Sequence, residues 1–529
     1  MGEIEFFILL LGAVALLAQL ARLLSVPYPI FLVLGGLVIG FVPGLPEIEL
    51  APEVIFLIFL PPLLNSAAFS SSPRELRAHL RPISLLAIGL VLVTTLAVAF
   101  VAHALIEDLP WSAAFVLGAI LAPTDPVAAE AIFRRLGVPE RVNTVVGGES
   151  LVNDGSALVA YRLAVVAVVS GAFSLAQGGL DFLLVGGGGL LLGLVLARLV
   201  LPLWSRLGDP TIMITVSLLL PYVVYIVAEE LHVSGILAVV SYGLYQGWRA
   251  PSLFSGASTR LQALSFWETL VFLLNSLLFI LVGLQFPAIL EGSRESSVAD
   301  LLLYAALVCG VVIGVRLVWF FTVPYLHPVF DRLLRNRYLR APWQERLVMG
   351  WSGMRGAVSL AAALAIPLYT DTGAPFPGRD IIIFLTFCVI LVTLVLQGLT
   401  LPVLIRSLRI RSDGEGDALK ELQARLKASH AALGRLEQLC AYENVPPRSQ
   451  ERMREFYEDR IRRYTAGLEA GGVTEEYSES SKAWRSWRRE LIEAERATVI
   501  SLRDGGEINS EVMRRIERDL DLEESRIGG

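Results

Sequence analysis

Lysine is almost absent from this sequence. Its only lysines are Lys420, Lys427 and Lys482, so residues 1–411 contain none. A buried lysine can release its proton and act as a titrating group, whereas an arginine stays charged. Lysine is therefore excluded as a proton-exchanging group in the first 411 residues.

Cysteine and histidine are also scarce. The sequence has three cysteines (Cys309, Cys388 and Cys440), which lie far apart, and five histidines without ligand spacing. Disulfide frameworks and metal centres need such residues at short, characteristic intervals. The sequence therefore predicts neither, and we expect no cofactor.

Charged residues are few, and many of them lie near the end of the chain. Only 18% of the residues are charged and 54% are hydrophobic, whereas about a quarter of a soluble domain is charged. Residues 1–411 contain 25 acidic residues and 24 arginines, while the much shorter segment 412–529 contains 25 acidic and 20 basic residues. This contrast predicts a membrane domain at 1–411 and a cytoplasmic, mostly helical, regulatory tail at 412–529.

Apolar runs of membrane-spanning length recur throughout the first domain. A helix needs about 20 mainly apolar residues to cross the hydrocarbon of a bilayer. Thirteen runs approach this length, which predicts an all-α polytopic membrane protein with 13 transmembrane helices. The runs are 4–24, 28–42, 53–70, 82–106, 111–133, 143–170, 180–204, 211–229, 233–249, 262–288, 299–323, 345–369 and 379–407.

The charges of the loops predict the orientation of these spans. Arginines gather in alternate loops, such as those near 74–81 and 134–141, while acidic residues such as Glu107 and Glu229 occupy the loops between them. Cytoplasmic loops are rich in basic residues. We therefore expect a multi-pass protein of the cell (inner) membrane with its N-terminus outside and, after an odd number of spans, its tail in the cytoplasm.

Ionisable groups inside the spans mark the functional region, because each costs at least about 2–3 kcal/mol at the bilayer centre. The fifth span contains Leu121-Ala-Pro-Thr-Asp-Pro126. Its two prolines remove backbone donors and disfavour helix just before each ring. The span must break here, and broken backbone is tolerated only where it lines a protein cavity or polar site. Thr124 and Asp125 lie inside the break.

The sixth and twelfth spans carry two further unusual segments. Glu149, Ser150, Asn153 and Asp154 open the sixth span at positions i, i+1, i+4 and i+5, which share one wide helix face. This set of oxygen ligands suits a small hard cation rather than a soft metal. In the twelfth span three glycines within 350–356 surround Arg355 and weaken the helix.

The interrupted spans are the fifth and the twelfth, which lie seven apart. This spacing predicts two inverted six-helix repeats, spans 1–6 and 8–13, with span 7 as a linker. Paired broken helices in inverted repeats point to the central site of a transporter.

At these residues the sequence resembles the cation:proton antiporter-1 family, the NhaP/NHE type of sodium/proton exchanger, and in particular its bacterial branch. The matching segments follow the order of the family along the chain. They are Leu60-Pro-Pro-Leu63, Thr124-Asp-Pro-Val-Ala128, Gly148-Glu-Ser-Leu-Val-Asn-Asp154, Phe266-Trp-Glu268, Gly353-Met-Arg-Gly-Ala-Val-Ser359 and Gln397-Gly-Leu-Thr-Leu-Pro402.

The resemblance implies which residues handle the ion. Asp154 would bind the cation or the proton, and Glu149, Ser150 and Thr124 would complete the Na⁺ ligands. The resemblance also implies a homodimer. The expected partners are thus a monovalent cation, a proton and the lipid bilayer, with no nucleic acid.

Three further residues would organise the site by the same resemblance. Asn153 would belong to the Asn-Asp pair of electroneutral relatives, Arg355 would pair with Glu149 and Asn153, and Asp125 would offset a positive half-helix terminus. The chain departs from some relatives at Asn65-Ser66, where those relatives carry an acid.

These residues lead us to expect one proton for each cation. If Arg355 keeps Glu149 ionised, only Asp154 can exchange a proton, because the domain has no lysine. We therefore expect Na⁺ or Li⁺ to compete with H⁺ for Asp154 and to exchange 1:1, without net charge movement, by alternating access. Such a protein is a secondary transporter and not an enzyme.

Other functions stay open at this point. A K⁺/H⁺ antiporter on the same scaffold is an alternative, because oxygen ligands alone do not fix the size of the ion. A remote alternative is an intramembrane aspartyl protease built on Asp125 and Asp154, which would need two carboxylates that share a proton. We interpret Arg162 and Arg316 as structural partners of buried acids.

Overall fold

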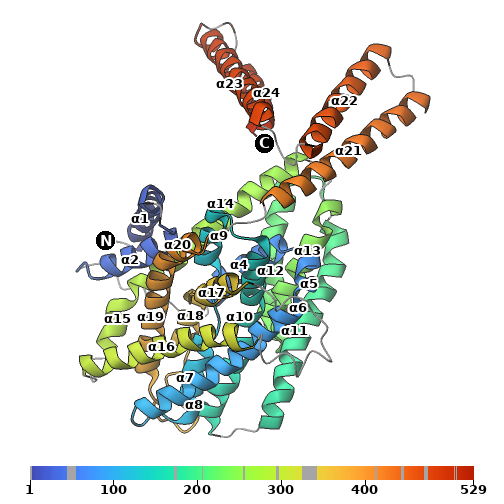
Figure 1. The fold of residues 1–529 in the computed structure, drawn as a ribbon. Coiled ribbons are helices and arrows are strands. Elements are labelled where there is room, and N and C mark those ends of the chain that lie inside the picture. Colours follow the sequence, from blue (N-terminus) through green and yellow to red (C-terminus); the bar gives the residue numbers. More distant parts are fainter. Residues whose placement is uncertain are drawn as a thin grey trace. The chain divides into compact units, whose positions relative to one another are not determined.

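In the computed structural model, all regular elements of the described residues are helices, and one isolated β-bridge joins Tyr369 and Pro375. The described residues are 3–528 without 25, 44–54, 172–174, 205, 254–256, 293–296, 324–341, 411–413, 443–445, 470–474, 506 and 508. The chain divides into two compact units, Met1–Ser412 and Asp413–Gly529 (Figure 1). The predicted boundary between 411 and 412 lies outside the described residues.

Helices occupy every predicted apolar run of the first unit. Among the described residues, eight helical segments are long and apolar enough to cross a membrane, and three shorter apolar segments are Tyr28–Gly40, Ile55–Ser70 and Trp111–Leu121. The helices are α1 (Glu3–Leu24), α2 (Tyr28–Gly40), η1 (Ile55–Phe59), α4 (Leu60–Ser70), α5 (Pro73–Ala78), α6 (Leu80–Ser84), η2 (Leu85–Leu90), α7 (Val91–Leu105), α8 (Trp111–Leu121), α9 (Val127–Leu136), α10 (Glu140–Ser170), α11 (Leu175–Trp204), α12 (Pro210–Glu230), α13 (Gly235–Leu253), α14 (Ala257–Leu284), α15 (Phe286–Gly292), α16 (Val298–Thr322), α17 (Trp343–Trp351), α18 (Ala357–Leu364), α19 (Arg379–Val392), η5 (Thr393–Gln397) and α20 (Gly398–Ser407).

Both predicted helix breaks are present. Helix α8 ends at Leu121 and α9 begins at Val127, so the two prolines lie in the connecting segment. Helix α17 ends at Trp351 and α18 begins at Ala357, on either side of the glycine-rich segment. The broken backbone is well buried, in keeping with the rule that non-helical backbone at membrane depth must be covered by protein.

The helices of the first unit pack in two groups. The core bundle consists of α6–α10, α16–α19, η5 and α20, in which α8 packs against α7 and α10. The scaffold consists of α1, α2, α4 and α11–α14, in which α2 packs on α14 and α13 packs on α4 and α11. Figure 1 shows α11, α12 and α13 side by side, with α10, α17 and α18 near the centre of the unit.

The second unit contains two helix pairs. Helix α21 (Gly414–Tyr442) packs against α22 (Pro447–Glu469), and α23 (Glu475–Asp504) packs against α24 (Ser510–Gly528). In the second pair Ile492 and Leu520 form a small buried cluster. Arg496 of α23 binds Asp521 and Glu524 of α24 at 2.6 and 2.9 Å. Apolar contacts and charges therefore both hold this pair together.

Candidate functional site

The four polar residues of the sixth predicted span lie on one continuous helix, α10. Glu149, Ser150, Asn153 and Asp154 are all buried, with at most 9% of their surface exposed. Burying two carboxylates in a membrane domain is costly unless each finds a partner or a neutralising ion. The surroundings of the two carboxylates therefore decide what this site can do.

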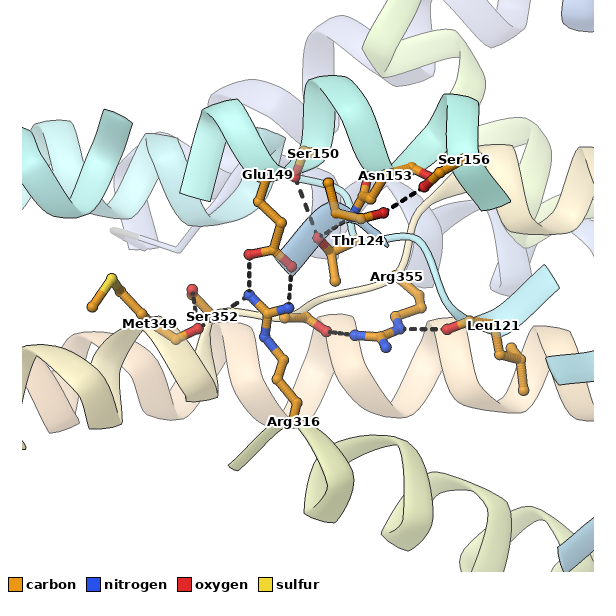
Figure 2. A network of polar contacts seen from close by, with 12 residues as sticks. Leu121, Thr124, Glu149, Ser150, Asn153, Ser156, Arg316, Met349, Ser352 and Arg355 are labelled. Atoms are coloured by element: carbon orange, nitrogen blue, oxygen red, sulfur yellow. Dashed lines mark hydrogen bonds and ion pairs between the residues drawn. The ribbon is translucent and has the colours of Figure 1, made fainter. Parts of the chain in front are cut away.

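Thr124 connects the first helix break to α10 (Figure 2). Its Oγ1 accepts a hydrogen bond from Asn153 Nδ2 at 2.9 Å and lies 3.3 Å from Ser150 Oγ. Thr124 is itself 3% exposed. The structure thus brings together three of the predicted oxygen-bearing residues, from two separate spans.

The two helix breaks cross at Asp125. Its backbone N–H donates to the carbonyl oxygen of Met354 in the other break at 2.8 Å. Its Oδ1 accepts from the backbone N–H of Val127, the first residue of α9, at 2.9 Å. Its carboxylate also lies against Gly356, where any Cβ would collide with it. Asp125 therefore lies where α9 and α18 both begin, next to the positive ends of two helix dipoles.

Arg355 lies at the carboxyl ends of α8 and α17, whereas Asp125 lies at the amino ends of α9 and α18. Its Nε donates to the carbonyl oxygen of Leu121, the last residue of α8, at 2.9 Å, and its guanidinium also donates to the carbonyl of Gly353 just beyond α17 (Figure 2). Its backbone N–H donates to Thr393 Oγ1 of η5 at 3.1 Å. Because the carboxyl end of a helix is negative, this buried cation compensates the α8 and α17 termini.

The partner of Glu149 is Arg316 of α16, and the predicted pairing of Arg355 with Glu149 and Asn153 is wrong. Arg316 donates from both terminal nitrogens to the two carboxylate oxygens of Glu149, one of them at 2.8 Å, and Nη2 also donates to Met349 O at 3.2 Å (Figure 2). Only 2% of each side chain is exposed. Arg316 is thus the structural partner of a buried acid, as predicted.

Asp154 differs from Glu149 in having no such partner. Among the described residues, none forms a hydrogen bond or an ion pair with its carboxylate, although the residue is only 9% exposed. The neighbouring Asn153 Oδ1 is also buried without a partner. An unpaired buried carboxylate needs a proton or a cation to be stable. Asp154 can chemically accept either one.

A cavity of about 960 Å³ lies beside this site, between the core bundle and the scaffold. It reaches Pro126 of the first break and Gly147 and Gly148, directly before Glu149. Asn65 and Ser66, where some relatives carry an acid, also line it. Its walls carry four carboxylates and two arginines, which are Glu75, Glu130, Glu140, Glu268, Arg134 and Arg260.

Sequence reasoning missed Thr393, which fixes the position of Arg355 through its backbone. A single threonine in an apolar run carries no signal, and in helices such hydroxyls usually bond the preceding turn. The cavity wall formed by Gln246 of α13 and Asn275 of α14 was missed for the same reason. The described residues contain no group of three or more His, Cys, Asp or Glu that could hold a metal ion.

Comparison with known proteins gives one consistent result. The family model described as the transmembrane sodium/hydrogen exchanger matches residues 8–407. The chain is 36% identical over 523 residues to an uncharacterized Na⁺/H⁺ exchanger of Mycobacterium tuberculosis, covering 98% of this chain and 95% of that protein. It is 37% identical over 401 residues to a sodium, potassium, lithium and rubidium/H⁺ antiporter of Bacillus subtilis, covering 72% of this chain and 58% of that protein.

A solved structure shares the fold. The sodium proton antiporter MjNhaP1 from Methanocaldococcus jannaschii superimposes with a TM-score of 0.61 at 22% sequence identity. The match covers 77% of this chain and 98% of that structure. The helical arrangement described above is therefore that of a known antiporter fold.

Proposed function

This chain belongs to the sodium/hydrogen exchanger family, and from that premise we propose that it exchanges Na⁺ for H⁺ at the carboxylate of Asp154. The observation that carries the proposal is the contrast between the two buried acids of α10. Glu149 is neutralised by Arg316, whereas Asp154 has no partner among the described residues. Of these two acids, only Asp154 is thus free to trade a proton for a cation.

The proposed cation ligands are oxygens of neighbouring residues on α10 and in the first helix break. Ser150 and Thr124 supply hydroxyl oxygens, and the unpartnered Oδ1 of Asn153 is a further donor in the same region. Glu149 would contribute through the lone pairs that Arg316 leaves unused. Hard oxygen donors of this kind suit an alkali cation.

Competition between the two ions follows from the single carboxylate. A proton on Asp154 removes the negative charge that attracts a cation, and a bound cation disfavours the proton. Exchange then requires only that the site face the two sides of the membrane in turn. Since arginine does not titrate and residues 1–411 have no lysine, one H⁺ would exchange for one monovalent cation.

The remaining features of the proposal concern topology. We place thirteen spans in the cell (inner) membrane as two inverted six-helix repeats, with the N-terminus outside and a regulatory tail in the cytoplasm. The cavity is lined by Glu75, Arg134 and Glu140 of the arginine-rich loops, so it would open to the cytoplasm. We also expect a homodimer.

Potassium is the second candidate substrate. The Bacillus subtilis relative carries K⁺, Li⁺ and Rb⁺ in its name as well as Na⁺. Oxygen ligands from side chains do not by themselves fix the size of the ion. Measuring the pH response of everted vesicles after addition of Na⁺, Li⁺ or K⁺ separates these substrates.

The test of the proposed function is the substitution Asp154→Asn. It keeps the size of the side chain and removes the titrating charge, so we expect at least about a hundredfold loss of Na⁺/H⁺ exchange in everted vesicles, with normal membrane insertion. Asp181→Asn is the matched control, because Asp181 lies on scaffold helix α11 away from the site. Exchange retained by Asp154→Asn would refute the assignment.

A further inference from the structure

An ion pair joins the core bundle to the scaffold at the far end of α10. Nη2 of Arg162 on α10 lies 3.0 and 2.8 Å from the two carboxylate oxygens of Glu229 on α12. The side chains are 48% and 32% exposed, so the protein does not enclose this pair. An ion pair of this geometry forms readily. Because a partly exposed pair contributes at most about 1 kcal/mol, it can also open.

The scaffold side of this pair is held in place. Glu229 Oε1 also accepts a hydrogen bond from the backbone N–H of Gly235, the first residue of α13, at 3.2 Å. The adjacent Ser234 N–H donates to Val185 O of α11 at 3.0 Å. Glu229 is thus bonded to the start of α13, which is itself bonded to α11, while Arg162 belongs to the helix that carries the candidate ion site.

The order of contacts along α10 shows on which side of Asp154 the Arg162–Glu229 pair lies. Gly148 lines the cavity, and Asp154 and Arg162 follow six and fourteen residues later. At 1.5 Å per residue these positions lie about 9 and about 21 Å beyond Gly148 along the helix. Between them, Gly155 packs so closely against the side chain of Leu237 on α13 that a Cβ at 155 would collide with it. The cavity thus lies on one side of Asp154, and these two contacts lie on the other.

We propose that Arg162–Glu229 and Gly155–Leu237 form the gate that closes the ion site toward the face opposite the cavity. The inference rests on the proposed exchange function, because only an alternating-access protein must open this path. The apolar Gly155–Leu237 contact excludes ions from this path. The Arg162–Glu229 ion pair, called the latch below, holds that contact closed. Both must separate before Asp154 reaches the second face. Arg162 and Glu229 therefore set the ratio between the two access states and take no part in binding the ion.

A cysteine placed behind the latch tests this gate. Val159 lies four residues from Gly155 and three from Arg162, hence on the same side of α10, and is 4% exposed. In a chain whose Cys309, Cys388 and Cys440 are replaced by serine, Val159→Cys is treated with a membrane-impermeant thiol reagent from each side. With the latch intact, we expect slow labelling, and only from the face opposite the cavity.

Removing either charge of the latch should speed this labelling. Arg162→Gln and Glu229→Gln should each raise the rate about two- to fivefold, the range available from a partly exposed ion pair. Glu229→Gln keeps an oxygen for Gly235 N–H. The double variant should label no faster than the faster single variant, because both changes remove one interaction. Arg198→Gln is the matched control, because Arg198 bonds Tyr245 within the scaffold, and it should leave the rate unchanged.

Two results would overturn the gate. One is an unchanged labelling rate in Arg162→Gln, and the other is an equal increase in Arg198→Gln. Exchange by the parent protein is measured in the same vesicles. A parent protein that does not exchange Na⁺ for H⁺ refutes the proposed function, while a change in labelling still reports on the latch itself.

Discussion

At the scale of single residues, two buried arginines neutralise different groups. Arg316 neutralises a side chain, Glu149, and Arg355 compensates the carbonyl ends of two broken helices. Each has little access to water, so neither can be exchanged for a neutral residue without leaving an unbalanced charge behind. Of the two buried acids of α10, Glu149 is thus ion-paired and Asp154 has no partner among the described residues.

This division predicts the behaviour of Arg316→Gln. Removing one partner of a buried ion pair typically costs about 3–5 kcal/mol, so we expect a clear fall in the thermal stability of the purified protein and loss of exchange. Adding Glu149→Gln should recover most of the stability, because the unpaired charge is then gone, but should not recover exchange. Thermal unfolding in detergent and vesicle transport measure the two effects. A double variant as unstable as Arg316→Gln would contradict the pairing argument.

All of the predicted site residues occur in the described part of the chain, and three of them, Thr124, Ser150 and Asn153, contact one another. The sequence singled out Thr124, Asp125, Glu149, Asn153 and Asp154 as candidates because charged and polar groups in apolar spans are costly. It was not sufficient to pair the acids with the arginines. Glu149 and Arg316 are 167 positions apart, and only the packing of α16 on α17 and α7 brings the arginine to the site.

At the scale of structural elements, the crossing of the two helix breaks is the central feature. The Asp125 N–H bonds Met354 O, and Gly356 leaves room for the Asp125 carboxylate. The prolines of the fifth span and the glycines of the twelfth allowed us to predict where each helix stops, because these residues disrupt helix at their own positions. Their mutual contact and the help of Thr393 depend on tertiary packing, which no local pattern encodes.

Gly356→Ala tests how tightly this crossing is built. A Cβ at 356 would overlap the Asp125 carboxylate, so either the acid or the α18 terminus must move. Overpacking of this kind typically costs about 1–3 kcal/mol, and we expect at least about a tenfold loss of exchange. Gly314→Ala on α16 is the control, because a Cβ there meets no heavy atom within 4 Å. Equal exchange rates in the two variants would mean that the crossing tolerates a shift.

At the scale of the whole molecule, the composition predicts an apolar part followed by a highly charged one, and the structure divides into two compact units near the same place. Within the second unit, α21 packs against α22 of the same chain. The arrangement of core bundle and scaffold could not be read from the sequence, because every span is apolar on most of its faces. Only the contacts reveal that one ion pair, Arg162–Glu229, joins the two groups at the far end of α10.

The number of titrating groups at the site sets the electrical behaviour of the whole molecule. Glu149 is held by Arg316 and the chain has no lysine before residue 420, so on the proposed function we expect one monovalent cation to replace one proton without net charge movement. A potential of 100 mV changes the energy of one transferred charge by about 2.3 kcal/mol, which is about a fiftyfold driving force. We therefore expect proteoliposomes to show the same Na⁺/H⁺ exchange with and without a potential set by an ion that the protein does not carry. Na⁺ uptake driven by that potential at equal pH would show that a second group titrates, and Glu149 would be the first to suspect, because its ionised state depends on a single arginine.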